Sequence, residues 1–239
     1  MSSSNLCEEL GLNLNFFKRV FFESEKVYET LKSAVEKAKG IEEFFYPYVG
    51  AEIVKVLKEK NKIVFLKRIG SGRVAPNRME KIDFLLEICS NSLGIELKID
   101  EGLNGLMFGY QSSNKDKIVG GLDAKNLAKF FYKENLQTVN KCTQAKGKEK
   151  ISDGLIIDYL KLGRLIECNF LKEGIVVGIT KKAKKGKQCQ RQELEKWLEE
   201  ILNIAKEFVE KNNLTLPSNT RIEVYEKDDL ILIWIYIYQ

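Results

Sequence analysis

Nine apolar residues near the C-terminus, LILIWIYIY at positions 230–238, restrict the fold more than any other segment of the sequence. The run is far shorter than the ~20 apolar residues that a membrane-spanning helix requires. Its β-branched and aromatic side chains favour a strand, and it lacks the alternation that is typical of a strand with one solvent-facing side. We therefore expect a strand that is covered on both faces of a sheet, or one that pairs across a dimer interface.

The rest of the chain alternates helical and strand-like segments, which is typical of an α/β domain with a central mixed sheet flanked by helices. The pattern predicts helices at residues 15–40, from Pro47 to about Lys60, at 122–140 and at 193–213, a Gly-rich loop at 102–121, and strands at 62–69, within 81–100, and at 154–162, 164–171, 174–180 and 221–238. With 239 residues, 44% of them hydrophobic, the chain can bury one substantial core. We expect a single domain with a helical extension at 1–40, a core at about 41–180, and a C-terminal helix and hairpin at 190–239.

The chain contains no histidine, which excludes the catalytic triads and zinc enzymes that depend on an imidazole. Its five cysteines are scattered and form no CxxC pair, so we expect structural thiols, although the sequence leaves a disulfide open. Hydrolytic chemistry would therefore depend on carboxylates, lysines and a divalent metal with oxygen ligands. The N-terminus lacks the pattern of a secretory signal, so we expect a soluble cytoplasmic protein.

Three ionisable residues interrupt an apolar hairpin, KIDFLLEICSNSLGIELKID, at residues 81–100. Glu96 and Lys98 are two positions apart and therefore project from the same face of their strand. A four-residue turn at 89–92 would pair the strands and bring Asp83 beside Glu96. Two neighbouring carboxylates repel each other unless a cation lies between them, and Mg²⁺ prefers such oxygen ligands. Lys98 would then orient or deprotonate a metal-bound water and stabilise charge on an attacked phosphate.

The segment IDFLLE followed by GIELK resembles the catalytic motif of the PD-(D/E)XK nuclease superfamily, which includes restriction endonucleases and archaeal Holliday-junction resolvases. In this resemblance Asp83 takes the place of the first acid, and residues 96–98 take the place of the (D/E)XK tripeptide. The resemblance implies a restriction-endonuclease-like core between about residues 43 and 160. It also implies an assisting glutamate on the preceding helix, for which Glu52 is the first choice and Glu43 the second.

The resemblance implies a DNA endonuclease that hydrolyses phosphodiester bonds with Mg²⁺ or Mn²⁺. Asp83 and Glu96 would bind the metal, and Lys98 would activate water. Two features depart from the family pattern: Ile82 stands where many members have proline, and the next predicted helix has no QxxxY element. Two alternatives stay open. In the first, a protein with this fold would bind nucleic acid without cutting it. In the second, Glu96 and Lys98 would form the solvated face of an edge strand and have no catalytic role.

Basic residues outside the hairpin are the candidates for contact with a DNA backbone. The net charge is +5 and the pI is about 8.8, which is compatible with a nucleic-acid partner. In a nuclease, lysine-rich and arginine-containing loops would neutralise phosphates. The candidates are Lys181, Lys182, Lys184, Lys185 and Lys187 in one loop and Arg73 and Arg78 in another. A homodimer would suit cleavage of a duplex or a junction, and the sequence leaves this open.

Overall fold

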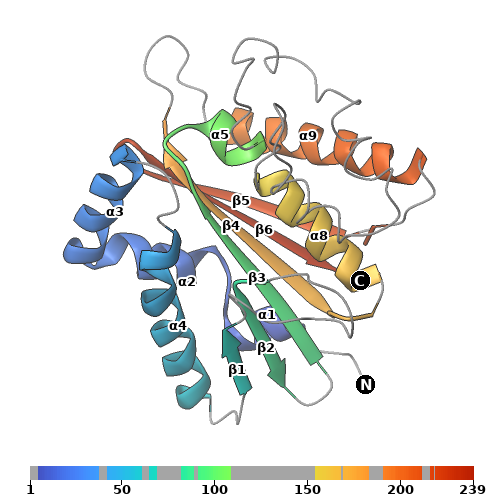
Figure 1. Ribbon diagram of the computed structural model, residues 1–239, viewed down its shortest axis with the longest axis horizontal. Helices are drawn as coiled ribbons and strands as arrows, with labels where there is room; N and C mark the ends of the chain where they lie inside the picture. Colours follow the sequence, from blue (N-terminus) through green and yellow to red (C-terminus); the bar gives the residue numbers. More distant parts are fainter. Residues whose placement is uncertain are drawn as a thin grey trace, which may run out of the picture.

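A six-stranded mixed sheet forms the centre of the molecule, with the strand order β1-β2-β3-β4-β6-β5 (Figure 1). The computed structural model describes residues 5–37, 42–60, 65–68, 82–88, 91–108, 154–167, 169–182, 191–211, 216–217 and 219–239. The strands are β1 (Phe65–Arg68), β2 (Phe84–Ile88), β3 (Asn91–Ile99), β4 (Glu173–Lys181), β5 (Asn219–Lys227) and β6 (Leu230–Tyr238). Only β3 and β4 pair in parallel among these strands. The predicted α/β class with a central mixed sheet is confirmed.

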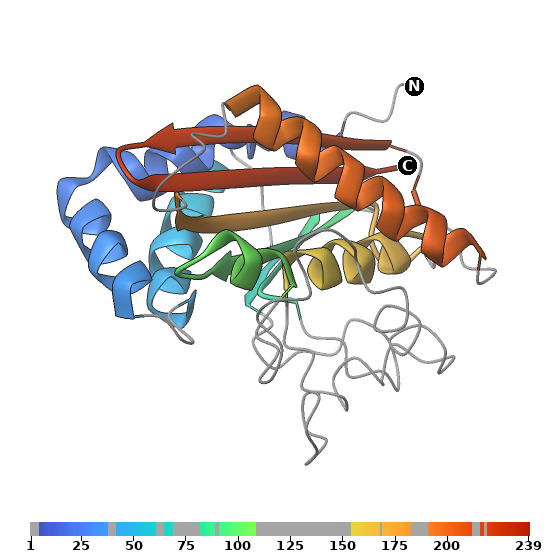
Figure 2. The same cartoon turned by 90° about the horizontal axis from the view of Figure 1, so that it is seen from above.

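Helices cover both faces of this sheet (Figure 2). One face packs against the N-terminal helices, and the other packs against the helices that follow β3 and β4. The first set is α1 (Leu6–Leu10), α2 (Leu14–Lys18), a π-helical turn (Arg19–Glu23), α3 (Glu25–Lys37) and α4 (Glu42–Glu59). The second set is α5 (Leu103–Phe108), α8 (Leu155–Glu167) and α9 (Arg191–Lys211).

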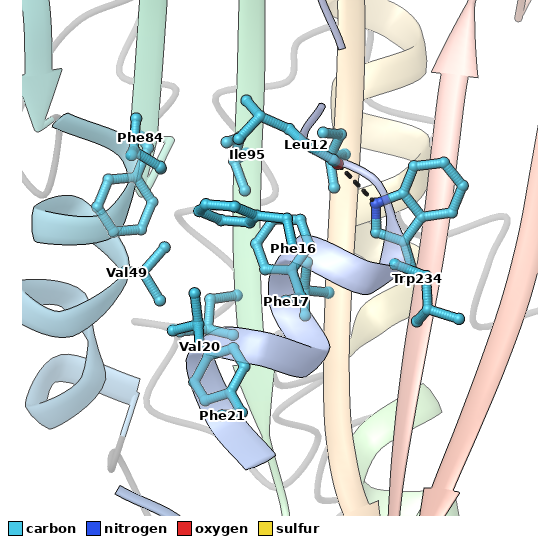
Figure 3. Close-up of a cluster of buried hydrophobic side chains, with 14 of the residues drawn as sticks. Leu12, Phe16, Phe17, Val20, Phe21, Val49, Phe84, Ile95 and Trp234 are labelled. Carbon is cyan, nitrogen blue, oxygen red and sulfur yellow. Dashed lines mark hydrogen bonds between the residues drawn. The ribbon is translucent and has the colours of Figure 1, made fainter. Parts of the chain in front are cut away.

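Aromatic side chains fill the layer between the N-terminal helices and the sheet (Figure 3). The rings of Phe16 and Phe17 meet edge to face, with centroids 5.0 Å apart. The indole Nε1 of Trp234 on β6 donates a hydrogen bond of 3.2 Å to the carbonyl oxygen of Leu12. Because buried indole N–H groups need an acceptor, this bond fixes the N-terminal segment against the sheet. Residues of the predicted N-terminal extension therefore contribute to the core.

Strand β6 occupies an interior position, which explains its unbroken apolar sequence. Residues 230–237 are all buried, and β6 pairs with β4 on one side and with β5 on the other. The prediction of a strand covered on both faces is confirmed. Since both of its edges are paired within the chain, the alternative of pairing across a dimer is wrong for this strand.

The largest difference from the sequence prediction concerns residues 155–167, which form the single helix α8 rather than parts of two strands. Most of its described side chains are buried, and its apolar run is long enough to be mistaken for a buried strand, although Asp158, Lys161 and Arg164 recur at helical spacing. Gly163 falls between the two predicted strands. It lies inside the helix, where a Cβ atom would approach the side chain of Leu216 to 2.9 Å.

Smaller differences concern where elements begin and end. The helix predicted at 15–40 is divided by the π-helical turn and by a bend at Ser24. Pro47 lies inside α4 rather than in its first turn. Residues 103–108 of the predicted Gly-rich loop form α5. The predicted helix at 122–140 lies outside the described residues.

The pairing of β2 with β3 extends further than predicted. Asn91 and Ser92, which the predicted four-residue turn contained, pair with Ile88 and Glu87. The last pair at the other end is Phe84 with Ile95, and one position beyond it lie Asp83 and Glu96. The observed register therefore places the two predicted acids opposite each other where β2 begins.

Candidate functional site

Asp83 lies at a bend immediately before β2, where its carboxylate completes the hydrogen bonding of β3. Its Oδ2 accepts a hydrogen bond of 2.8 Å from the backbone N–H of Leu97, and its Oδ1 accepts one of 2.7 Å from the hydroxyl of Tyr46 on α4. Strand β2 begins at Phe84, which pairs with Ile95, so the part of β3 beyond Ile95 has no partner residue in β2. The backbone N–H groups of that part of β3 need other acceptors on this side. The carboxylate of Glu42 accepts the next such group, the N–H of Ile99, at 3.2 Å.

Glu96 projects from the face of β3 that α8 covers. Its side chain is only 6% exposed, and its carboxylate contacts the ammonium of Lys161. The same ammonium lies 3.3 Å from Oδ1 of Asp158, one helical turn before it. β3 pairs with strands on both sides, so the alternative that Glu96 stands on the solvated face of an edge strand is wrong.

Glycines in the sheet allow α8 to approach closely enough for this contact. The side chain of Leu162 lies directly over Gly94 of β3 and Gly174 of β4, and a Cβ atom at either glycine would come within about 3 Å of it. Gly94 shares a face of β3 with Glu96, and Leu162 directly follows Lys161 along α8. The close packing of helix on sheet therefore places Lys161 beside Glu96.

We define the acidic cluster as Asp83, Glu96 and Asp158 together with Lys161. Burial raises the pKa of Glu96 well above its ordinary value; the charge of Lys161 opposes this shift, and those of Asp158 and Asp83 reinforce it. Burial also raises the pKa of Asp83, against the hydrogen bonds from Leu97 and Tyr46. The charges of Asp158 and Lys161 affect the pKa values of both Glu96 and Asp83, so these four side chains lie close enough to act on one another electrostatically.

Lys161 carries the positive charge within this unit. Burial alone would lower the pKa of Lys161, but the charges of Glu96 and Asp158 outweigh it, and the pKa lies above its ordinary value. Lys161 therefore stays protonated at neutral pH. Three carboxylates and one ammonium leave an excess of negative charge when all are ionised, which favours a further cation or a proton at this position.

Lys98 shares the face of β3 with Glu96, as its spacing predicts. It is partly buried, and its charge lowers the pKa of Asp100, which lies just beyond the end of β3 and whose pKa is raised mainly by burial. The ammonium that contacts Glu96 in the structure belongs to Lys161. The role of Lys98 at a metal-bound water stays a prediction.

Glu52 lies on α4 and forms ion pairs with Arg19 and Lys55, each at 4.0 Å. It follows Tyr46 by six residues, which is about 240° around the helix, so it faces away from the side that reaches Asp83. Within the described residues, no ion pair or hydrogen bond joins Glu52 to the acidic cluster. The side chain of the second choice, Glu43, lies outside the described part of the structure.

The predicted DNA-binding lysines are described only in part. Lys181 ends β4 and forms an ion pair of 2.9 Å with Glu36, and Lys182 forms one of 2.5 Å with Glu226. Lys184, Lys185, Lys187, Arg73 and Arg78 lie outside the described residues. Among the cysteines, Cys7 is described: it is a buried free thiol, and burial raises its pKa, as expected of a structural cysteine.

Asp158 and Lys161 are the site residues that the sequence analysis missed. Their spacing of three residues is a helical signal, but it lies in a segment that was interpreted as strand. In the described part of the chain, no three acidic, cysteine or histidine side chains form a ready group for one metal ion. The carboxylates of Asp83 and Glu96 nevertheless suit Mg²⁺, which commonly binds one or two carboxylates and completes its shell with water and substrate phosphate.

No protein-family model, curated protein or solved structure matches this chain. None of the helices in the described ranges combines the length and the apolar character that crossing a bilayer requires. The function has to be inferred from the arrangement of the chain's own side chains.

Proposed function

We propose that the protein is a metal-dependent DNA endonuclease whose active site is the acidic cluster. The observation that carries this proposal is that Glu96 and Asp158 both contact the ammonium of Lys161, with Asp83 near enough for its charge to affect the pKa values of Glu96 and Lys161. Buried carboxyl groups whose pKa values are raised by burial, as those of Glu96 and Asp83 are, are costly for stability, and such groups cluster at functional sites.

The element order adds support for a restriction-endonuclease-like core. Helix α4 precedes the antiparallel strands β1, β2 and β3, and α8 then leads to β4, which is parallel to β3. A restriction-endonuclease-like core would have the order helix, strand, hairpin, helix and strand. Here α8 and β4 would take the last two places, rather than the helix predicted at 122–140 and the strand predicted at 154–162. Asp83 directly precedes β2 and Glu96 lies within β3, which are the places that the resemblance gives to the two acids.

In this proposal, Asp83 and Glu96 hold Mg²⁺ or Mn²⁺. The bound metal supplies Lewis acidity and lowers the pKa of a coordinated water. Leu97 N–H and the Tyr46 hydroxyl fix the orientation of the Asp83 carboxylate. Lys98, on the same face as Glu96, contributes an ammonium that attracts the phosphate of the substrate. The assisting role of Glu52 at the metal or its waters stays a prediction.

A second candidate function is binding of nucleic acid without cleavage. The ammonium of Lys161 already pairs with Glu96 and Asp158, so the cluster has a compensating charge in the absence of a metal. A protein of this kind would keep the fold and the basic loops and would use the acidic cluster for stability. The DNA partner and the cytoplasmic location are parts of the proposal that rest on the sequence, and the homodimer stays a prediction.

The test is incubation of the purified protein with duplex, junction, flap and single-stranded DNA, with Mg²⁺, Mn²⁺ or EDTA. The endonuclease proposal predicts cleavage of at least one substrate with metal and none with EDTA. Binding that weakens as salt rises, without cleavage in any metal, would favour the second candidate. Absence of both cleavage and salt-sensitive binding would contradict both candidates.

A further inference from the structure

The ammonium of Lys161 lies in the position that a cation shared by Glu96 and Asp158 would occupy. It contacts the carboxylate of Glu96 and lies 3.3 Å from Oδ1 of Asp158. The Lys161 side chain is 16% exposed, and those of Glu96 and Asp158 are 6% and 8% exposed. Solvent therefore screens these charges only weakly.

A divalent ion and this ammonium cannot both lie against Glu96 without a large electrostatic cost. Like charges a few ångströms apart in a poorly hydrated site repel each other strongly. The contact also occupies a lone-pair direction of the carboxylate that a metal would need. Leu162, the next residue on α8, packs over Gly94 and Gly174 and fixes the helix against the sheet at this point. The ammonium of Lys161 can therefore leave Glu96 by a change of the Lys161 rotamer, without movement of the helix.

We propose that Lys161 is an internal counter-ion that competes with a divalent cation for Glu96. This inference rests on the metal dependence of the proposed function and assigns its regulation: metal binds tightly only when the ammonium of Lys161 leaves Glu96. The phosphate backbone of a substrate is a natural acceptor for the displaced ammonium, because charge-assisted contacts to phosphate are strong. Binding of substrate and binding of metal are then coupled through one lysine.

The experiment measures Mn²⁺ binding in the absence of DNA, by calorimetry or by electron paramagnetic resonance of the free ion. The proteins compared are the wild type, Lys161→Met and a matched control, Lys196→Met, in which an exposed lysine on α9 is changed. Both variants lose one positive charge, so the control accounts for the change in net charge. We expect Lys161→Met to bind Mn²⁺ at least about tenfold more tightly than the wild type, and Lys196→Met to bind it as the wild type does.

A double variant, Lys161→Met with Glu96→Gln, tests whether the additional Mn²⁺ affinity depends on the carboxylate of Glu96. We expect it to lose the increase in affinity, and retention of the increase would overturn the assignment to Glu96. If circular dichroism shows that Lys161→Met does not fold, Lys161→Gln replaces it, since an amide can still donate a hydrogen bond to Glu96. Affinity no higher than that of the wild type in the folded variant overturns the proposal. No DNA is present, so failure here is distinct from failure of the endonuclease proposal, which appears as absent cleavage.

Discussion

The carboxylate of Asp83 accepts the backbone N–H of Leu97 at 2.8 Å, at a place where β2 has no residue to pair with β3. Asp83 thus has a structural role in addition to its proposed role as a metal ligand. The two roles differ in what they require. A hydrogen-bond acceptor suffices for the first, whereas the second needs a negative charge.

Asparagine and alanine at position 83 separate these roles. Asp83→Ala leaves the Leu97 N–H without its acceptor, and we expect it to lower the free energy of unfolding by about 1–3 kcal/mol. Asp83→Asn keeps a carbonyl oxygen, so we expect a smaller loss, while both variants abolish metal-dependent cleavage. Urea unfolding and single-turnover cleavage measure the two effects. Cleavage at the wild-type rate by Asp83→Asn would contradict the role as metal ligand.

Tyr46→Phe tests how the second hydrogen bond to Asp83 affects its ionisation. The hydroxyl of Tyr46 lowers the pKa of Asp83, which burial raises. Removing the hydroxyl should raise that pKa further. Because Asp83 has to be ionised to bind metal, we expect the acidic limb of kcat/KM to move to higher pH. Tyr48→Phe, an exposed tyrosine on the same helix, is the control and should leave the pH profile unchanged. A shift to lower pH in Tyr46→Phe would be inconsistent with this account.

Lys161→Met tests the contribution of the buried ion pair to stability. Removing one partner of a buried pair leaves uncompensated charge, and we expect a loss of about 3–5 kcal/mol in the free energy of unfolding near neutral pH. Without Lys161, the pKa of Glu96 rises further above its unfolded value. A carboxyl group whose pKa is raised on folding contributes stability at low pH and loses it as pH rises through the folded pKa.

The difference in stability between the wild type and Lys161→Met should therefore grow as pH rises above the ordinary pKa of glutamate. Unfolding measured at several pH values between acidic and neutral conditions gives this difference, with Lys196→Met as the control. A difference that shrinks with rising pH would show that Lys161 does not compensate the carboxylate of Glu96.

Glu52→Gln examines the assisting glutamate that the sequence resemblance implies. In the structure Glu52 pairs with Arg19 and Lys55 on a partly exposed surface, where an ion pair contributes about 0–1 kcal/mol. We expect the variant to keep its stability within that range and to cleave DNA at a rate close to that of the wild type. A loss comparable to that of Asp83→Asn would instead restore Glu52 to the active site.

The sequence predicted those parts of the fold in which local pattern and tertiary environment agree. β6 is one example, because nine apolar residues suit a strand with neighbours on both sides and helices on both faces. Asp83 and Glu96 were found because an acid inside an apolar hairpin needs a compensating partner. The predicted partner is a metal beside Lys98. In the structure Lys161 pairs with Glu96, and Tyr46 and Leu97 donate hydrogen bonds to Asp83.

Lys161 was missed because its helix is buried on several sides. A mostly apolar run of this kind fits a buried strand as well as a buried helix, and the two helical signals in it are the three-residue spacing of Asp158 and Lys161 and the glycines beneath it in β3 and β4. The register of the hairpin was missed for a different reason. The length of the turn depends on the pairing of Ile88 with Asn91, which the residues at 89–92 do not determine by themselves.

The most direct test of the central claim is single-turnover cleavage of DNA by the wild type and by Glu96→Gln, with Mg²⁺ or Mn²⁺ and with DNA binding measured on the same samples. Glutamine keeps the size of the side chain and removes its charge. The account predicts that the wild type cuts DNA only with metal, and that Glu96→Gln binds the same DNA with similar affinity but does not cut it. Equal cleavage by both proteins would contradict a metal-dependent active site at Glu96.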